Sequence, residues 1–230
     1  MVYLSRGTQN TPGPKTQELM QLFSDYTAFQ SVLLDPHRCN TPISIKKDLK
    51  EEMARKNPNI IITGTPGVGK TTHAEQLAQA TGLKHVSVNQ IVKDEGFHEG
   101  KDEETGSWIV DEDKLLDYLE ERNISEEGGS ILDWHACDLF PERWIDLVVV
   151  LRCDSTVLYD RLTARGYKDK KLDENMDSEI MQVLLDEARE AYKEEIVVEL
   201  RSDSADDVEG NLERIEQWIE NWKKDHGGEE

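Results

Sequence analysis

The residues from Gly64 to Thr71 carry the clearest chemical signal in the sequence. They read Gly-Thr-Pro-Gly-Val-Gly-Lys-Thr and fit the pattern G-x-x-x-x-G-K-[ST]. An apolar run, Ile60 to Ile62, precedes the motif, and a helix-compatible segment, 73–80, follows it. A strand, a glycine-rich loop and a helix in this order point backbone N–H groups at an anion. The sequence therefore favours a loop that binds the phosphates of a nucleoside triphosphate over an ordinary glycine-rich turn.

Residues within this loop have distinct expected roles. Gly64, Gly67 and Gly69 let the backbone curl around the phosphates. Lys70 reaches the β- and γ-phosphates as a mobile point charge, and the hydroxyl of Thr71 is placed to ligate Mg²⁺. We expect the loop to form the donor half of a phosphate-transfer site.

Asp133 is the candidate for the second half of the Mg²⁺ site. It follows the apolar residues Ile131 and Leu132, and a carboxylate at the end of a neighbouring strand holds Mg²⁺ through its water shell. The alternative is a turn residue at the end of a strand. His135, two residues later, either orients a water or assists proton transfer, or is a packed loop histidine.

Arg161 and Arg165 lie four residues apart on one face of an expected helix, before Gly166 and a lysine-rich segment. Guanidinium groups stabilise the charge of phosphoryl transfer when a mobile segment closes over the site. We interpret this segment as a lid. The alternative is a surface helix with cations at i and i+4.

The elements that would position these residues alternate between strand and helix patterns. Strands are expected at 60–63, 84–87, 130–133, 145–151 and 196–200. Helices are expected at 70–81, 88–95, 111–122, 154–165, 177–192 and 205–224, with a polar stretch at 96–107. This alternation predicts a doubly wound α/β fold, with a five-stranded parallel sheet and helices on both faces.

The chain of 230 residues suits one domain with a small appendage. Residues 1–56 are expected to form a partly disordered or helical extension, either a tail or a docking segment, and 57–230 the domain. Residues 1–57 contain eight Lys and Arg and six Asp and Glu. Residues 58–230 contain nineteen Lys and Arg and forty-two Asp and Glu, so this part carries the whole negative excess. This acidic surface disfavours nucleic acid and favours basic protein partners, or serves solubility alone.

The longest apolar run, Leu147 to Leu151, is far shorter than the roughly twenty residues that a membrane helix needs. The N-terminus lacks an apolar signal core, so secretion is not expected. Cys39, Cys137 and Cys153 are widely spaced and odd in number, which favours reduced thiols in a cytoplasmic or nuclear protein.

Six phrases together resemble one known family. They read Gly-Thr-Pro-Gly-Val-Gly-Lys-Thr-Thr (64–72), Ile-Val-Asp-Glu-Asp (109–113), Asp-Trp-His (133–135), Phe-Pro-Glu-Arg (140–143), Leu-Val-Val-Val-Leu-Arg (147–152) and Arg-Gly-Tyr (165–167). From Pro58 to about Asp225 the sequence resembles the adenylate kinase isoenzyme six family, also called the coilin-interacting nuclear ATPase family. The resemblance does not include the first fifty-odd residues.

The resemblance implies a P-loop NTPase fold like that of nucleoside monophosphate kinases. It implies Mg²⁺-dependent transfer of phosphate from ATP to AMP, giving two ADP, together with intrinsic ATPase activity. The implied Walker B carboxylate is Asp133, and His135 is tied to ATP hydrolysis. The implied nucleotide contacts are Gly67, Gly69, Lys70, Thr71, Thr72 and Arg165.

The resemblance also outlines an AMP side, with a monophosphate-binding segment at about 87–110 and a lid at about 164–174. Ordinary adenylate kinases grip AMP with an arginine where this sequence has Lys93, which keeps the charge but loses the bidentate fork. Two further residues are candidates for contacts with AMP, Arg143 and Arg161. Arg143 lies in a run that replaces the Asp-Gly-Phe-Pro-Arg sequence of ordinary adenylate kinases.

The family also assists late assembly of the small ribosomal subunit, in the nucleus and the cytoplasm. The implied partners are a basic platform ribosomal protein and the pre-40S particle, toward which the acidic surface would mimic rRNA. An ATPase-driven assembly factor with incidental kinase activity is therefore the alternative function, and a kinase for another small molecule is a third. The sequence leaves the oligomeric state open.

Overall fold

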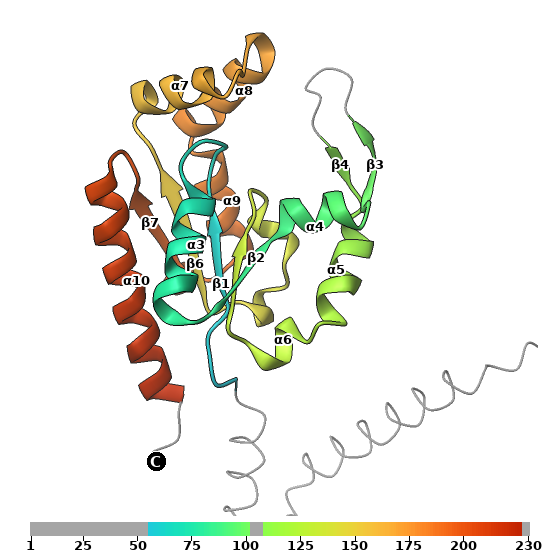
Figure 1. Cartoon of the computed structure of the whole chain (residues 1–230), viewed down its shortest axis with the longest axis vertical. Helices are drawn as coiled ribbons and strands as arrows, with labels where there is room; N and C mark the ends of the chain where they lie inside the picture. The colour runs from blue at the N-terminus through green and yellow to red at the C-terminus, as the bar shows by residue number, and fades with distance from the viewer. Residues whose placement is uncertain (1–54, 102–107, 227–230) are drawn as a thin grey trace, which may run out of the picture. The chain divides into compact units, whose positions relative to one another are not determined.

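A computed structural model of the chain describes residues 55–101 and 108–226 (Figure 1). Of the expected N-terminal extension, 1–56, all but the last two residues lie outside the described part, so this boundary stays a prediction. Cys137 and Cys153 are buried free thiols, and Cys39 lies outside the described residues. None of the described helices combines the length and the apolar composition that a membrane span requires.

The described residues form a parallel sheet of five strands, in the order β2-β5-β1-β6-β7 (Figure 1). The strands are β1 (Ile60–Thr63), β2 (Lys84–Ser87), β5 (Ser130–Asp133), β6 (Leu147–Arg152) and β7 (Val197–Arg201). The two strands beside β1 are β5 and β6, and all three are buried along their whole length. Apolar runs without alternation are what strands covered on both faces require. The predicted five-stranded parallel sheet is confirmed.

Helices cover both faces of this sheet, as predicted. The helices are α3 (Lys70–Thr81), α4 (Val88–Asp94), α5 (Glu112–Glu120), α6 (Ile124–Glu127), α7 (Ser155–Ala164), α8 (Asp169–Ile180), α9 (Val183–Ala191) and α10 (Ala205–His226). Short 3₁₀ turns occupy 137–139, 142–144 and 194–196. Ile60 and Ile62 pack in one core with α3, α7 and α10, and Ile61 packs in another with α4, α5 and α9. The two-residue period of a strand divides β1 between the two layers.

Local hydrogen bonds fix where several helices begin. Asp154 accepts a bond of 2.9 Å from Thr156 N at the start of α7. At the start of α10, Ser204 Oγ accepts from Asp207 N at 3.2 Å, and Asp207 accepts from Ser204 N at 2.9 Å. These are the N-cap and the capping box that the sequence predicts.

Two sequence-based expectations were wrong. The polar stretch 96–107 contains the strand β3 (His98–Lys101), which pairs in an antiparallel hairpin with β4 (Trp108–Val110), directly after the stretch. The helix expected at 177–192 is two helices, because Gln182 adopts a left-handed conformation with φ 61° and ends the first of them. That first helix, α8, already begins at Asp169, within the predicted lid.

Candidate phosphate-transfer site

The loop between β1 and α3 curls as its glycines predict. Gly64 has φ 137°, and a Cβ at this position would lie 2.5 Å from the carbonyl oxygen of Leu151 on β6. Gly69 has φ 101° and precedes the first residue of α3. Both positions therefore require glycine, for close approach and for a left-handed backbone. The result is a concave loop of backbone amides that ends at a helix N-terminus, which suits an anion.

Lys70 lies against this loop, with 9% of its surface exposed. Its Nζ donates hydrogen bonds to the carbonyl oxygens of Gly64 at 2.7 Å and Thr65 at 3.2 Å. Burial lowers the pKa of Lys70 to about 8, although the Asp133 carboxylate partly offsets this effect. The ammonium thus rests on loop carbonyls that bound phosphate oxygens can replace.

Thr71 and Asp133 meet at the carboxyl ends of β1 and β5. Thr71 Oγ1 donates to Asp133 Oδ2 at 2.6 Å. Asp133 is 2% exposed, and its other oxygen, Oδ1, has no hydrogen-bond partner among the described residues. A hydroxyl beside a carboxylate with an open acceptor fits Mg²⁺ held partly through water. The described residues contain no group of three His, Cys, Asp or Glu side chains that could hold a metal ion.

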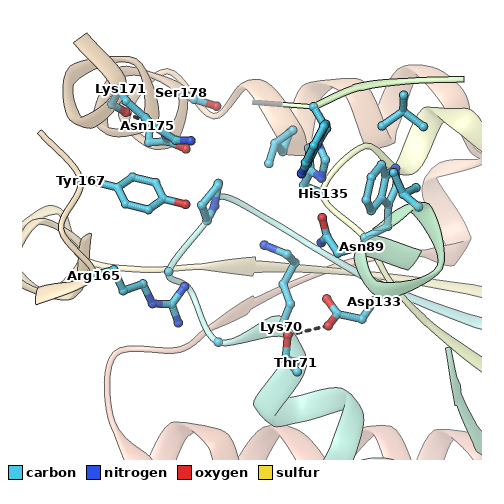
Figure 2. Close-up of a pocket in the computed structure, with 18 of the residues that line it drawn as sticks. Lys70, Thr71, Asn89, Asp133, His135, Arg165, Tyr167, Lys171, Asn175 and Ser178 are labelled. Atoms are coloured by element: carbon cyan, nitrogen blue, oxygen red, sulfur yellow. Dashed lines mark hydrogen bonds between the residues drawn. The ribbon is translucent and has the colours of Figure 1, made fainter. Parts of the chain in front are cut away.

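These groups open into a cavity of about 600 Å³ (Figure 2). Nine of the predicted site residues line it: Gly67, Gly69, Lys70, Thr71, Thr72, Lys93, Asp133, His135 and Arg165. Figure 2 shows the Lys70 side chain between Asp133 and Arg165. Residues that lie up to 98 positions apart in the chain, from Gly67 to Arg165, therefore face one space.

The cationic side of the cavity comes from the segment after β6. Arg165 is exposed at the end of α7, Tyr167 follows in the link to α8, and Lys171 lies in the first turn of α8. Lys171 Nζ lies 5.1 Å from the centre of the Tyr167 ring. Together with Lys70 these groups place three positive charges around the phosphate end of the cavity.

His135 lies on the wall beyond Asp133, with its ring 4.2 Å from that of Trp134. Part of its surface is exposed, yet the protein around the ring and the nearby Lys70 ammonium lower its pKa to about 4. At neutral pH the imidazole is therefore uncharged and has one nitrogen free of a proton.

Two predicted residues do not reach the cavity. Arg161 is turned toward the end of β7, where it donates to the carbonyl oxygens of Ser202 at 2.8 Å and Asp203 at 2.9 Å. Arg161 is half-buried within α7, whereas Arg165 is the exposed residue that follows the last residue of that helix. Arg143 is exposed in a 3₁₀ turn near Glu120, at a separate surface hollow. The placement of both on the AMP side is corrected.

The other end of the cavity is formed by α4 and the hairpin. Lys93 lies here with Asn89, one turn earlier on the same helix, and with Trp108 of β4. Asn89 was missed by sequence reasoning, although its spacing of four from Lys93 places both on one face. Asn175 and Ser178 also line the cavity and were not predicted. They lie four and seven residues after Lys171, and this helical spacing places all three on one face of α8. Trp108 had no such signal, because its strand was not predicted.

A phosphate-binding loop after the central strand of a parallel sheet, with an Mg²⁺-compatible carboxylate on the next strand, is the architecture of P-loop nucleotide kinases. Comparison with known proteins gives the same class. A family model described as an AAA domain matches residues 60–182, more than half of the chain. The shikimate kinase from Acinetobacter baumannii in complex with shikimate has a TM-score of 0.51 at 15% identity, covering 72% of this chain and 94% of that chain. At this identity it shows the fold alone.

Curated relatives are more specific. An adenylate kinase isoenzyme 6 homolog from Schizosaccharomyces pombe is 54% identical over 172 residues, which cover 75% of this chain and 97% of that protein. One from Caenorhabditis elegans is 47% identical over 172 residues, covering 75% of this chain and 94% of that protein. The chain belongs to the family of adenylate kinase isoenzyme 6 homologs.

Proposed function

We propose that the protein transfers the γ-phosphate of ATP to AMP in the presence of Mg²⁺, giving two ADP. One observation carries this proposal: a single cavity joins the phosphate loop to a second, cationic end at Lys93. A nucleotide held by the loop would direct its last phosphate toward that end. The family name that the relatives carry supports the same reaction.

The chain's own groups supply the electrostatics of such a transfer. The loop amides and Lys70 bind the β- and γ-phosphates, and Arg165 adds a planar guanidinium where charge develops. Lys70 exchanges its bonds with Gly64 and Thr65 for phosphate oxygens. Mg²⁺, when bound by Thr71 and through water by Asp133, supplies further charge neutralisation.

AMP would lie against α4 and the hairpin. Lys93 is exposed on the cavity wall and offers a point charge to the α-phosphate of AMP, without the two parallel hydrogen bonds of an arginine. Asn89 and Trp108 offer an amide and an aromatic surface to the rest of the nucleotide. We therefore expect binding of AMP to depend on Lys93 and to be strengthened by an arginine there.

The same site would hydrolyse ATP slowly when AMP is absent. The uncharged imidazole of His135 faces the cavity and can accept a proton from a water molecule near the γ-phosphate. Replacing His135 with glutamine should therefore reduce hydrolysis more than transfer to AMP, since a hydroxyl of AMP phosphate is already ionised at neutral pH.

A second candidate function is that of an assembly factor, in the nucleus and the cytoplasm, whose ATPase cycle releases a basic small-subunit platform ribosomal protein. The excess of forty-two acidic over nineteen basic residues in 58–230 favours it. In this case, complex formation with such a protein should weaken strongly between low and physiological salt, because exposed charges are screened. Salt-independent binding would contradict the electrostatic part of this proposal.

One experiment separates the two functions. ATP consumption is measured with Mg²⁺ alone, with AMP added, with the purified platform protein added, and with a panel of other small phosphate acceptors. Strong stimulation by AMP supports the kinase, and stimulation by the protein alone supports the assembly factor. A higher rate with an acceptor that is not a nucleotide would contradict both.

A further inference from the structure

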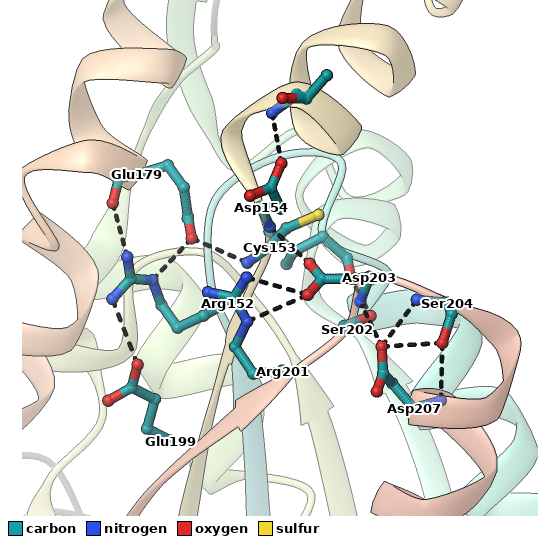
Figure 3. Close-up of polar contacts among 12 residues, drawn as sticks. Arg152, Cys153, Asp154, Glu179, Glu199, Arg201, Ser202, Asp203, Ser204 and Asp207 are labelled. Atoms are coloured by element: carbon teal, nitrogen blue, oxygen red, sulfur yellow. Dashed lines mark hydrogen bonds and ion pairs between the residues drawn. The ribbon is translucent and has the colours of Figure 1, made fainter.

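Glu179 is a buried carboxylate that has no part in the phosphate-transfer chemistry described above. It lies in the last turn of α8 and is 2% exposed. Figure 3 shows its side chain facing Arg152 at the end of β6. A carboxylate this far from water is costly unless its hydrogen bonds are satisfied, so its partners show what holds it there.

One oxygen and the backbone of Glu179 bind the end of β6. Glu179 Oε1 accepts from Arg152 Nε at 2.7 Å and from Cys153 N at 3.0 Å. The backbone carbonyl of Glu179 accepts from a terminal nitrogen of Arg152 at 2.8 Å. Arg152 also lies 3.5 Å from Glu199 Oε1, which is more exposed. These contacts neutralise Arg152 and attach α8 to the sheet.

The other oxygen of Glu179 binds the phosphate loop. Glu179 Oε2 accepts a hydrogen bond of 2.6 Å from the hydroxyl of Thr65, which is 1% exposed. The carbonyl oxygen of the same Thr65 accepts from Lys70 Nζ at 3.2 Å and from Val68 N at 3.3 Å. Glu179 and Lys70 therefore both bind Thr65, so a single residue links the buried carboxylate to the lysine that is proposed to bind phosphate.

Helix α8 carries cavity residues on the turns that precede Glu179. Lys171, Asn175 and Ser178 line the cavity opposite the loop. A helix advances about 1.5 Å per residue and is stiff over two turns, so a fixed Glu179 sets the position of Lys171 eight residues earlier. The helix ends one residue later, at Ile180, and the left-handed Gln182 separates it from α9.

We propose that Glu179 is a positioning residue for phosphate transfer, which holds α8 and the phosphate loop in register through the hydroxyl of Thr65. Lys70 on the loop and Lys171 on the helix then face the same phosphates. The inference rests on the proposed function, because it concerns the same site. A role confined to neutralising Arg152 would need only Oε1 and would leave the bond to Thr65 without effect.

The test uses the full-length protein and substitutions that change one bond at a time. Thr65→Val keeps the shape of the side chain and removes the hydroxyl, and Thr65→Ser keeps the hydroxyl. Thr65→Ala is the second variant if the valine does not fold, as judged by thermal unfolding. Glu199→Gln is the matched control, since it changes the other carboxylate beside Arg152 and touches no loop residue.

Two quantities are measured: the dissociation constant for a non-hydrolysable ATP analogue with Mg²⁺, by calorimetry, and the rate of ATP consumption with AMP. We expect Thr65→Val to weaken binding and to lower turnover, each about tenfold, with Thr65→Ser and Glu199→Gln within threefold of the parent. Unchanged binding and turnover in Thr65→Val would overturn the proposal. If the parent lacks activity with AMP, the proposed function fails, and the binding constants still decide whether Glu179 positions the loop.

A double-mutant cycle gives a second test. Glu179→Gln retains the size of the side chain and weakens its bonds as an acceptor. If its effect passes through Thr65, Glu179→Gln lowers analogue affinity in the parent but adds nothing in the Thr65→Val background. Independent, multiplying losses in the two backgrounds would show that the two residues act separately and would overturn the proposal.

Discussion

The hydroxyl of Thr71 donates a 2.6 Å hydrogen bond to the carboxylate of Asp133, 62 positions later in the chain. The bond brings together the first turn of α3 and the end of β5, and it leaves Asp133 Oδ1 without a partner among the described residues. An acceptor that is buried and open beside a phosphate loop is suited to the water shell of Mg²⁺.

Replacing Asp133 with asparagine should therefore separate metal-dependent from metal-independent binding. The amide keeps the size of the side chain but lacks the charge, so we expect Mg²⁺-dependent turnover to fall by about 10²–10³-fold. Affinity for ATP in the presence of a chelator should change little. Asp117→Asn, the same substitution at an exposed position of α5, is the control. Parent-like turnover in Asp133→Asn would contradict the metal role.

The pKa of Lys70, lowered to about 8, predicts how nucleotide binding depends on pH. Phosphate binds the ammonium form, and the free protein loses this proton as pH rises through 8. The dissociation constant for the ATP analogue should therefore rise about tenfold between pH 7 and pH 9, since each pH unit above the pKa removes about nine-tenths of the remaining charged form. Lys70→Met should bind weakly at both values with no such rise. A flat profile in the parent protein would show that Lys70 remains charged throughout.

Substitutions of Arg165 and Arg161 should have different effects, one on turnover and the other on stability, although the two residues lie one helical turn apart. Arg165→Ala should lower turnover by about 10²–10³-fold with little change in stability, since it removes a charge from the cavity. Arg161→Ala should instead lower the free energy of unfolding by about 1–3 kcal/mol, because two carbonyl oxygens near the end of β7 lose their donor. Kinetics and denaturant unfolding of both variants check this. A loss of stability in Arg165→Ala together with a loss of turnover in Arg161→Ala would contradict the structure.

Lys93 should affect the binding of AMP, the phosphate acceptor, and not the binding of ATP, the phosphate donor. Lys93→Ala should raise the KM for AMP about tenfold with the KM for ATP unchanged, and Lys93→Arg should lower the KM for AMP by offering a bidentate donor. Arg143→Ala should affect neither constant, because Arg143 lies away from the cavity. An effect of Arg143→Ala on AMP that exceeds that of Lys93→Ala would contradict this arrangement.

The parts of the fold that could be predicted are those in which local pattern and burial agree. The run Leu147 to Leu151 has no polar alternation because both of its faces are covered, and the strand β6 was predicted within two residues. Asp133 was recognised because it ends such a run. The donor half of the site follows from these two signals together with the loop motif.

The parts that were missed depend on contacts between distant residues. The strand His98–Lys101 has no apolar alternation, and its pairing with Trp108–Val110 makes it a strand. The bond between Thr65 and Glu179 spans 114 positions and has no local sequence signature. Arg161 was assigned to the site by its spacing from Arg165, which cannot show that Arg161 binds the carbonyl oxygens of Ser202 and Asp203 while Arg165 lies beyond the end of the helix.

If one cavity holds a donor and an acceptor nucleotide, the stoichiometry of the products should reveal it. ATP, AMP and Mg²⁺ are incubated with the protein, and ADP and inorganic phosphate are quantified together over the initial phase. We expect two ADP to form for each ATP consumed, with almost no phosphate released, and we expect Lys70→Met to lose this reaction. One ADP and one phosphate for each ATP, at a rate that AMP does not change, would contradict it.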